Sequence, residues 1–378
     1  MSSPTFAGLG ASRAVADALA ARSIRRPFPI QELVLPDALA GRDVLVKAPT
    51  GSGKTLAFGV PLADLIEATD PRPSALVLVP TRELAGQIVE ELRPLAHARA
   101  LSVAAAYGGA GIEKQAKLAR RAHLLVATPG RLEDLIGRRA VDLSRVRILV
   151  LDEADRMLDM GFRPAVDRIV GDVSRRRQTL FFSATLDRSV RALADAYTRD
   201  PISHEHAHEE EQQAAVDHRF LAVDHHAKID VLVSQLSREG ARTLVFVRTK
   251  HGADRLVKRL RARGVEALAM HGNKTQSQRE RALTRFDSGR VDTLVATDVA
   301  ARGLHVDDIT DVINFDAPAD RDAYVHRVGR TGRAGRSGTG TTFVGAENAA
   351  DVERIATGLG LHQEFHRTGL GRPRRRAG

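Results

Sequence analysis

Three acidic side chains stand directly after a short apolar run in the first half of the chain. The run Ile148–Leu151 predicts a strand buried on both faces, and Asp152, Glu153 and Asp155 follow it. Ligands of open α/β sheets bind just beyond the carboxyl ends of such strands. Carboxylates gathered there are costly unless a cation compensates them, and Mg²⁺ is the common candidate. A structural alternative stays open, because Asp and Glu also stabilise the first turn of a helix.

A second stretch, APTGSGKT at residues 48–55, offers these carboxylates a chemical partner. It follows a predicted strand and opens a predicted helix, which is the context of a phosphate-binding loop. Lys54 would reach the β and γ phosphates, and the Thr55 hydroxyl would reach Mg²⁺. Small residues would let backbone N–H groups face the phosphates, and these are Thr50, Gly51, Ser52 and Gly53. An incidental glycine-rich turn is the alternative.

The two stretches together predict hydrolysis of a nucleoside triphosphate. Asp152 would hold Mg²⁺ through water, opposite the phosphate loop. Glu153 is placed to orient and deprotonate an attacking water, a role that binding without hydrolysis would not need.

The composition is that of a globular protein with two domains. The chain has 378 residues, of which 43% are hydrophobic and 28% charged. Cysteine is absent, which excludes disulfides, thiolate zinc sites and cysteine nucleophiles. No apolar run approaches the ~18 residues of a membrane span, and no secretory signal is visible. We therefore expect a cytoplasmic protein that does not bind membranes.

The charge balance favours a polyanionic partner. The formal net charge is +10, although a surface kept soluble by charge is an alternative reading. Aromatic residues make up only 4% of the chain and Trp is absent. Contact with a phosphate backbone therefore fits better than base stacking as the main binding mode.

Strands and helices alternate along both halves of the chain. The strand candidates of the first half are 43–47, 75–79, 101–105, 124–127, 148–151 and 179–182. Those of the second half are 219–223, 243–247, 267–270, 293–296, 312–314 and 341–344. This order predicts the α/β class, with mostly parallel sheets flanked by helices.

The pattern breaks at two places. We expect one domain over residues 1–200, a flexible linker over 201–217, a second domain over 218–366 and a basic tail over 367–378. The linker contains HEHAHEEEQQ, which is acidic and lacks apolar periodicity, although its His residues could instead bind a metal. The tail has five Arg and no acidic residue, which suits non-specific contact with a polyanion or simply aids solubility.

An ordered series of motifs extends these observations over residues 6 to about 345. D-E-A-D at 152–155, with APTGSGKT upstream, resembles the DEAD-box RNA helicase family, which belongs to helicase superfamily 2. Further motifs follow in the family's order: PIQ at 29–31, PTREL at 80–84, a Gly doublet at 108–109, TPGR at 128–131, SAT at 183–185, VFV at 245–247, HG with QSQR at 271–279, TDVAARG at 297–303 and HRVGRTGR at 326–333. The resemblance implies two tandem RecA-like domains.

For the nucleotide, the resemblance implies ATP with Mg²⁺. Gln31 resembles the glutamine that reads the adenine edge, since its amide can donate and accept at once. Phe6 matches an upstream aromatic, whereas Ile24 stands where the family usually has an aromatic that stacks on adenine. His305, which follows Gly303, stands where the family usually has an Asp that contacts the ribose. We hypothesise weaker or pH-dependent ATP affinity, and the alternative is a site that tolerates His without effect.

The resemblance also implies residues for catalysis and coupling. Arg330 and Arg333 resemble arginine fingers, which can be worth roughly 10³ to 10⁵ in rate and would complete the set formed by Lys54 and Glu153. The fingers lie on the second domain, so hydrolysis would require the domains to close. The alternative for this arginine cluster is a nucleic-acid-binding loop. Coupling of the nucleotide site to closure would involve Ser183, Thr185, Asp155 and His326, although a small-residue turn is the alternative for the first two.

The implied RNA contacts read no base edge. They are Arg82, Gly109, Thr128 and Arg131 in the first domain, and Gln276, Arg279 and Thr297 in the second. Binding should be largely independent of sequence and sensitive to salt, and contact with the 2′-OH would favour RNA over DNA.

We therefore predict an RNA-stimulated ATPase that closes on ATP and RNA and opens short duplexes locally and non-processively. An ATP-gated RNA clamp with little turnover and a DNA translocase are the alternatives. The RNA would be single-stranded or a short duplex, and the protein a monomer. Ribosomal and RNA-decay proteins are candidate partners, while the RNA target and the cellular process stay open.

Overall fold

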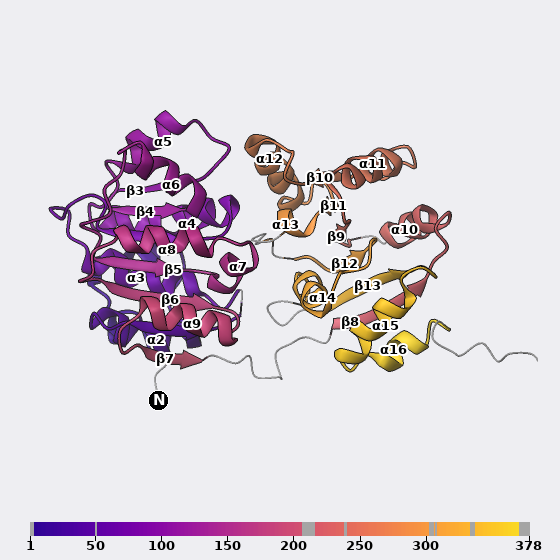
Figure 1. Ribbon diagram of the computed structural model, residues 1–378, viewed down its shortest axis with the longest axis horizontal. Coiled ribbons are helices and arrows are strands. Elements are labelled where there is room, and N and C mark those ends of the chain that lie inside the picture. Colours follow the sequence, from indigo (N-terminus) through magenta and orange to yellow (C-terminus); the bar gives the residue numbers. More distant parts are fainter. Residues whose placement is uncertain are drawn as a thin grey trace, which may run out of the picture. The chain divides into compact units, whose positions relative to one another are not determined.

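Two compact units make up the chain, and they divide between residues 208 and 209. The computed structural model describes residues 4–49, 51–205, 216–237, 240–301, 306, 308–332 and 337–369, with Val299 described by its backbone only. Each unit is built on one parallel sheet with helices on both faces (Figure 1). The predicted class, α/β with parallel sheets flanked by helices, is confirmed.

The first sheet has seven strands in the order β3-β4-β2-β5-β6-β1-β7. The strands are β1 (Val44–Lys47), β2 (Ala75–Leu78), β3 (Val103–Ala106), β4 (Leu124–Ala127), β5 (Ile148–Leu151), β6 (Gln178–Ser183) and β7 (Ile202–Glu205). The helices are η1 (Ala7–Leu9), α1 (Arg13–Ala21), α2 (Pro29–Leu39), α3 (Lys54–Leu65), α4 (Arg82–Ala98), α5 (Ile112–Ala119), α6 (Pro129–Gly137), α7 (Ala154–Asp159), α8 (Arg163–Asp172) and α9 (Arg188–Tyr197).

Strand β5 lies in the middle of this sheet and is buried on both faces. Leu149 and Leu151 pack in one hydrophobic cluster, whereas Ile148 and Val150 pack in the other. Alternate residues of a strand point to opposite faces, so burial on both faces requires the continuous apolar run. The burial predicted from the sequence is confirmed, and the carboxylates after Leu151 stand at the carboxyl edge of the sheet.

The second sheet has six strands in the order β10-β11-β9-β12-β13-β8. The strands are β8 (Val216–Ala222), β9 (Thr243–Phe246), β10 (Leu268–Met270), β11 (Thr293–Ala296), β12 (Asp311–Asn314) and β13 (Gly338–Val344). The helices are α10 (Lys228–Leu236), α11 (Lys250–Arg261), α12 (Gln276–Asp287), α13 (Asp298–Ala301), α14 (Arg321–Val328), α15 (Ala349–Gly358) and α16 (His362–His366).

The segment expected to be a linker, residues 201–217, begins and ends in strands, so the predicted linker is too long. Strand β7 pairs in parallel with β1, and Lys47 forms an ion pair of 2.5 Å with Glu205. Val216 begins β8, which pairs with β13. Apolar periodicity could not reveal β7, because only Ile202 is apolar and the strand is stabilised by its neighbour. The remaining linker residues and tail residues 370–378 lie outside the described part of the chain.

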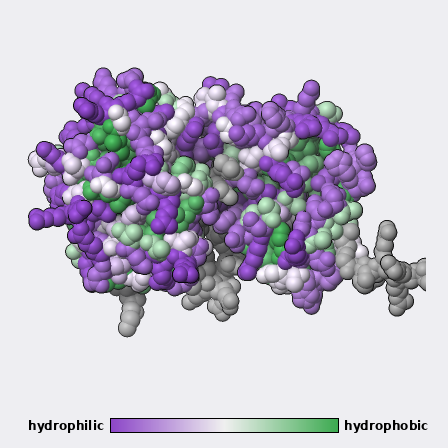
Figure 2. All heavy atoms as spheres, in the orientation of Figure 1, coloured by the Kyte–Doolittle hydropathy of each residue, from purple (hydrophilic) through white to green (hydrophobic). Residues whose placement is uncertain are grey.

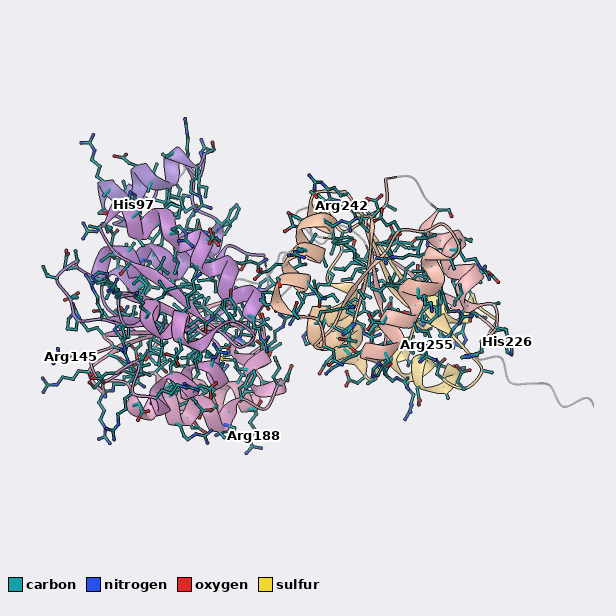
Figure 3. All side chains as sticks on the ribbon, turned by 90° about the horizontal axis from the view of Figure 1, so that it is seen from above. His97, Arg145, Arg188, His226, Arg242 and Arg255 are labelled. Atoms are coloured by element: carbon teal, nitrogen blue, oxygen red, sulfur yellow. The ribbon has the colours of Figure 1, made fainter. Side chains whose placement is uncertain are left out.

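The visible surface is mostly hydrophilic, with hydrophobic residues in small patches (Figure 2). Charged side chains such as Arg145 and Arg188 point outward from the first unit (Figure 3). Among the helices that the structure describes, none is both long and apolar enough to cross a membrane.

Candidate functional site

The predicted nucleotide-binding residues of the first unit lie at one edge of its sheet. The phosphate loop follows β1, Asp152 follows β5, and Ser183 ends β6. These strands are neighbours in the order β5-β6-β1, and all are parallel. Their carboxyl ends therefore bring together stretches that are about 100 residues apart in the sequence.

The phosphate loop needs glycine at two positions. Gly51 and Gly53 have φ angles of 87° and 88°, which side chains other than glycine rarely adopt. Lys54 begins α3 and is buried, and its Nζ donates hydrogen bonds to Ala48 O at 2.7 Å and Pro49 O at 3.3 Å. The ammonium group would exchange these carbonyl contacts for phosphate oxygens. Thr50 lies outside the described residues.

Gln31 ties the start of α2 to the phosphate loop. Its Oε1 accepts a hydrogen bond from Phe28 N–H at 2.9 Å, and its Nε2 donates to Gly53 O at 2.8 Å. The side chain is buried, so the amide is held in one orientation beside the loop. An amide fixed in this way can present its remaining donor and acceptor capacity to a nucleotide base.

Phe28 is a residue of this site that sequence analysis missed. A Cβ on Gly53 would lie 2.5 Å from Phe28 Cδ2 and 2.6 Å from Gln31 Nε2, so the ring covers the loop closely. The ring is nevertheless 58% exposed, the highest value among the large hydrophobic residues that the structure describes. Phe28 is also the N-cap of α2, where Ser, Thr, Asp or Asn is preferred. A phenylalanine at this N-cap position was the feature of the sequence that could have pointed to the site.

Asp152 is buried and fits a cation ligand. Burial raises its pKa to about 7, while the charge of Lys54 acts to lower the pKa and that of Glu153 to raise it. A divalent ion bound there would favour the charged form of this carboxyl. Thr55 lies in the first turn of α3, and its hydroxyl interacts with Glu91, whose pKa is raised by burial.

Glu153 is held in an unusual conformation. Its φ of 54° is left-handed, and it is the N-cap of α7. Its Oε2 lies 2.7 Å from Arg156 Nη1 in a buried ion pair. The sequence pattern predicted that Glu153 acts as the base, but it gave no signal for Arg156, which faces it.

Asp155, Ser183 and Thr185, the residues predicted to couple the nucleotide site to closure, form one hydrogen-bonded network. Asp155 Oδ2 accepts hydrogen bonds from Ala184 N at 3.2 Å, Thr185 N at 3.1 Å and Thr185 Oγ1 at 3.3 Å. Asp155 N–H donates to Ser183 Oγ at 3.4 Å. The end of β6 is thus joined by hydrogen bonds to the start of α7.

The other predicted residues near the nucleotide site are apolar and lie deeper. Phe6 is buried in the cluster that packs α1 against α3, with Val15 and Leu56. Ile24 is partly buried against the same cluster. Both side chains thus pack with α1 and α3, whereas the ring of Phe28 is exposed beside the loop.

The predicted RNA contacts of the first unit gather at the other half of the same edge. Arg82 begins α4 after β2, Gly109 follows β3, and Thr128 is the N-cap of α6 after β4. The strands are neighbours in the order β3-β4-β2. Gly109 has a φ of 88°, and Arg131 Nη1 donates to Ala110 O at 3.1 Å, which holds the glycine loop near α6.

The second unit repeats this placement. Gln276 and Arg279 lie on α12 after β10, and Thr297 follows β11, the neighbouring strand. All three side chains are mostly buried. Gln276 Nε2 donates to Glu280 at 3.1 Å, while its buried Oε1 makes no hydrogen bond within the described residues. That acceptor suits a polar ligand such as a ribose hydroxyl.

The arginine cluster divides into different roles. Arg327 makes two contacts with Asp298, at 2.5 and 2.8 Å, and donates to Asn314 Oδ1 at 3.1 Å and Asp316 O at 2.7 Å. Its guanidinium also lies 5.1 Å from the ring centre of Phe246. Arg327 therefore anchors α14 to the sheet, a structural role that sequence analysis did not separate from its neighbours.

Arg330 is buried beside the same helix. Its Nε donates to His326 O at 3.3 Å, one turn earlier in the chain. Arg333, Gly303 and His305 lie outside the described residues, so their predicted roles stay predictions.

Two family models match the chain. The DEAD/DEAH box helicase model matches residues 28–193, and the helicase conserved C-terminal domain model matches residues 224–335. These ranges contain the two groups of site residues described above, apart from Phe6 and Ile24.

Curated relatives and solved structures extend this similarity. The chain is 41% identical over 341 residues to the ATP-dependent RNA helicase CshA of Limosilactobacillus reuteri, covering 90% of this chain and 69% of the relative. It is 44% identical to the DEAD-box ATP-dependent RNA helicase CshA of Streptococcus pneumoniae, covering 84% of this chain but 61% of that relative. The structure of S. cerevisiae Dbp5 bound to RNA and ADP BeF3 has a TM-score of 0.85, with 30% identity and 94% coverage of both chains. The two sheets are thus tandem RecA-like domains.

Proposed function

Because the chain belongs to the DEAD-box helicase family, we propose that it is an RNA-stimulated ATPase that remodels RNA. One observation carries the proposal. The phosphate loop, the Asp152–Glu153 pair and the Asp155 network converge at one edge of the first sheet, with the predicted RNA contacts beside them. That edge is where an α/β sheet binds its ligands.

ATP is the proposed nucleotide. Gln31 would hydrogen-bond to the adenine edge, and the exposed ring of Phe28 would add to the simple apolar contact expected of Ile24. Lys54 would bind the phosphates. Mg²⁺, held by Asp152 through water, would neutralise charge on the phosphates when bound.

Hydrolysis would depend on Glu153 and on arginines of the second unit. Glu153 would orient the attacking water through a lone pair of its carboxylate. That lone pair must first be released from the contact with Arg156. Arg330 and Arg333 would stabilise charge that develops on the transferred phosphoryl group. Since these residues belong to different units, we propose that the units close on ATP and RNA.

RNA would bind along both units without reading base edges. The contacts would be Arg82, Gly109, Thr128 and Arg131 in the first unit and Gln276, Arg279 and Thr297 in the second. Closure would distort a bound strand and open a short duplex locally, and release of products would reset the cycle. We propose a cytoplasmic monomer as the working form.

One observation favours a second candidate, an ATP-gated RNA clamp with little turnover. Glu153 is neutralised by a buried arginine, and an engaged carboxylate is a weak base. Phosphate release with and without single-stranded RNA separates the candidates, with Lys54→Ala and Glu153→Gln as variants and circular dichroism as the folding control. If RNA stimulates hydrolysis by the wild type and both variants lose this activity, the result supports the ATPase. Nucleotide-dependent RNA binding without hydrolysis supports the clamp, and no nucleotide dependence of either contradicts both.

A further inference from the structure

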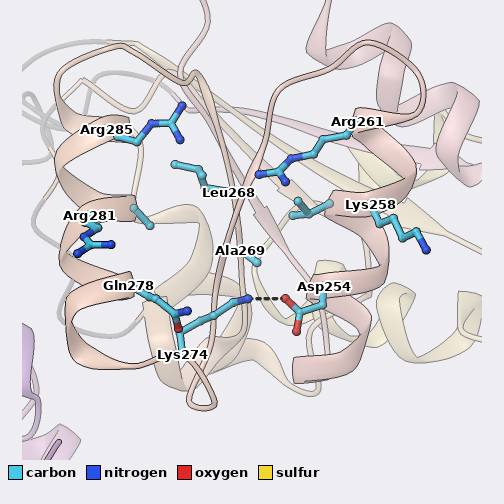
Figure 4. Close-up of a pocket in the computed structure, with 11 residues that line it drawn as sticks. Asp254, Lys258, Arg261, Leu268, Ala269, Lys274, Gln278, Arg281 and Arg285 are labelled. Carbon is cyan, nitrogen blue, oxygen red and sulfur yellow. Dashed lines mark ion pairs between the residues drawn. The ribbon is translucent and has the colours of Figure 1, made fainter.

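The second sheet has an open edge that lies in a trough. Strand β10 is the outermost strand of the sheet. Helices α11 and α12 flank it on opposite faces, because Val257 and Ala282 belong to different hydrophobic clusters. A cavity of about 460 Å³ lies between the helices, with Leu268 and Ala269 of β10 in its lining (Figure 4).

The lining of this trough is strongly basic. Lys258 and Arg261 come from α11, whereas Arg281 and Arg285 come from α12. With Lys274, these five cations face a single lining carboxylate, Asp254. Figure 4 shows Arg261 and Arg285 pointing toward each other from opposite walls, near Leu268. Like charges held this close repel one another, so an anion between the walls would be stabilising.

Two of these five cations have carboxylate partners, and Lys274 Nζ lies 2.8 Å from Asp254 (Figure 4). Arg285 Nη2 lies 2.7 Å from Glu266 in an exposed pair, which is worth little in stability. Among the residues that the structure describes, the Arg261 guanidinium donates one hydrogen bond, from Nη2 to Ala267 O at 3.2 Å. In the part of the chain that the structure describes, the side chains of Lys258 and Arg281 make no ion pair or hydrogen bond. Most of the positive charge is therefore available to a ligand.

One end of the trough meets the proposed RNA contacts. Lys274 and Gln278 line it there and lie within two residues of Gln276, in the turn before α12 and its first turn. From this end to Arg285, α12 extends about 14 Å at 1.5 Å per residue. The guanidinium fork matches phosphate oxygens, and the apolar floor suits sugar and base faces.

We infer that this trough binds the backbone of single-stranded RNA that extends past the contacts at Gln276 and Arg279. The inference rests on the proposed RNA-binding function and adds a path for the strand. Charges beside an edge strand also prevent edge-to-edge pairing, which needs no ligand. An acidic peptide paired with β10 is an alternative occupant, and it predicts no change in the salt dependence of RNA binding.

The test compares Arg261→Gln/Arg285→Gln with a matched control, Arg255→Gln/Arg259→Gln. The control arginines are exposed on α11, do not line the trough and carry the same charge. Fluorescence anisotropy of the full chain would measure affinity for oligouridylates of about 6 and about 20 nucleotides at several salt concentrations. Each phosphate contact contributes about 0.7 to the slope of log affinity against log salt.

For the long RNA, the slope of log affinity against log salt should be smaller in magnitude by about 1.4 in the trough variant than in the wild type. Over a fourfold rise in salt, the affinity of the variant should therefore fall about sevenfold less than that of the wild type. Its affinity for the short RNA should change less than twofold, and the control should keep the wild-type slope. An unchanged slope for the long RNA, or an equal loss in the control, would overturn the inference and leave edge protection or a peptide as the explanation. If RNA fails to stimulate hydrolysis, the proposed function is contradicted. The salt slopes of the two variants still show whether RNA binds in the trough.

Discussion

Glu153 Oε2 lies 2.7 Å from Arg156 Nη1, and the two side chains are only 5% and 7% exposed. The carboxylate proposed to activate water is therefore neutralised within its own helix turn. Glu153 also has a left-handed backbone, which fixes where the carboxylate points. We interpret the pair as the resting arrangement of the catalytic group.

Replacing Arg156 should destabilise the first unit strongly. Arg156→Met leaves a buried carboxylate without its partner, which costs about 3–5 kcal/mol. The matched control is Arg163→Met, because Arg163 forms an exposed pair with Asp167 at 3.8 Å. That change should cost less than about 1 kcal/mol. Urea unfolding of the full chain measures both, and equal shifts in the two variants would mean that the buried pair is not stabilising.

Phe28→Thr should separate stability from nucleotide affinity. Threonine caps a helix better than phenylalanine, so α2 should gain about 1 kcal/mol. Loss of the aromatic contact should raise the KM for ATP roughly 2- to 10-fold, at about 0.5–1.5 kcal/mol. The control is Leu33→Gln, since Leu33 is 44% exposed on the same helix. If the KM stays at the wild-type value, Phe28 does not contact the base.

Asp155→Asn should be costly although it preserves shape. Oδ2 accepts from Ala184 and Thr185, and Oδ1 accepts from Arg156 N–H at 3.0 Å. In either orientation of the side-chain amide in Asp155→Asn, its NH₂ group would face an N–H donor instead of an acceptor. The loss of these hydrogen bonds costs about 1.5–3 kcal/mol.

The control for that prediction is Asp187→Asn. Asp187 is the N-cap of α9 and uses only Oδ1, which accepts from Ser189 and Val190, so Asn should replace it at little cost. Thermal unfolding of both variants checks the comparison. A similar loss at both positions would contradict the role of the Asp155 network.

His123 should withdraw part of the stability of the first unit in mild acid, whereas the raised pKa of Asp152 acts in the opposite direction. Burial lowers the pKa of the His123 side chain, the hydrogen bond to Ala68 O and the charge of Asp70 oppose the shift, and Arg72 adds to it. Its folded pKa is thus below the unfolded value of about 6.5, so the stability is present above pH ~6.5 and declines as the pH falls below it.

His123→Asn keeps an acceptor for Ser102 N–H and should flatten this decline. His97→Asn, at an exposed position, should retain the wild-type profile. Melting temperatures from pH 5 to 8 would reveal the difference, and a decline that persists in His123→Asn would assign it to another group.

The sequence predicted the parts of this account that depend on local pattern. Doubly buried strands such as β5 are continuous apolar runs, and the motif order placed Lys54, Asp152 and Asp155 at one edge of one sheet. Strand β7 was missed because its stability comes from pairing with β1 rather than from its own residues. The roles of Phe28, Arg156 and Arg327 depend on side chains that meet only after folding. Nothing in the spacing of Arg327 and Arg330 indicates that the first is held by Asp298.

The claim that ATP and RNA bring the two units together is tested most directly by a distance between them. The chain has no cysteine, so Arg145→Cys/Arg255→Cys provides one labelling site in each unit, at exposed positions. Single-molecule energy transfer should show a new, shorter distance only when ATP and RNA are both present, and Lys54→Ala should abolish it. A distance that does not change with both ligands would contradict the account.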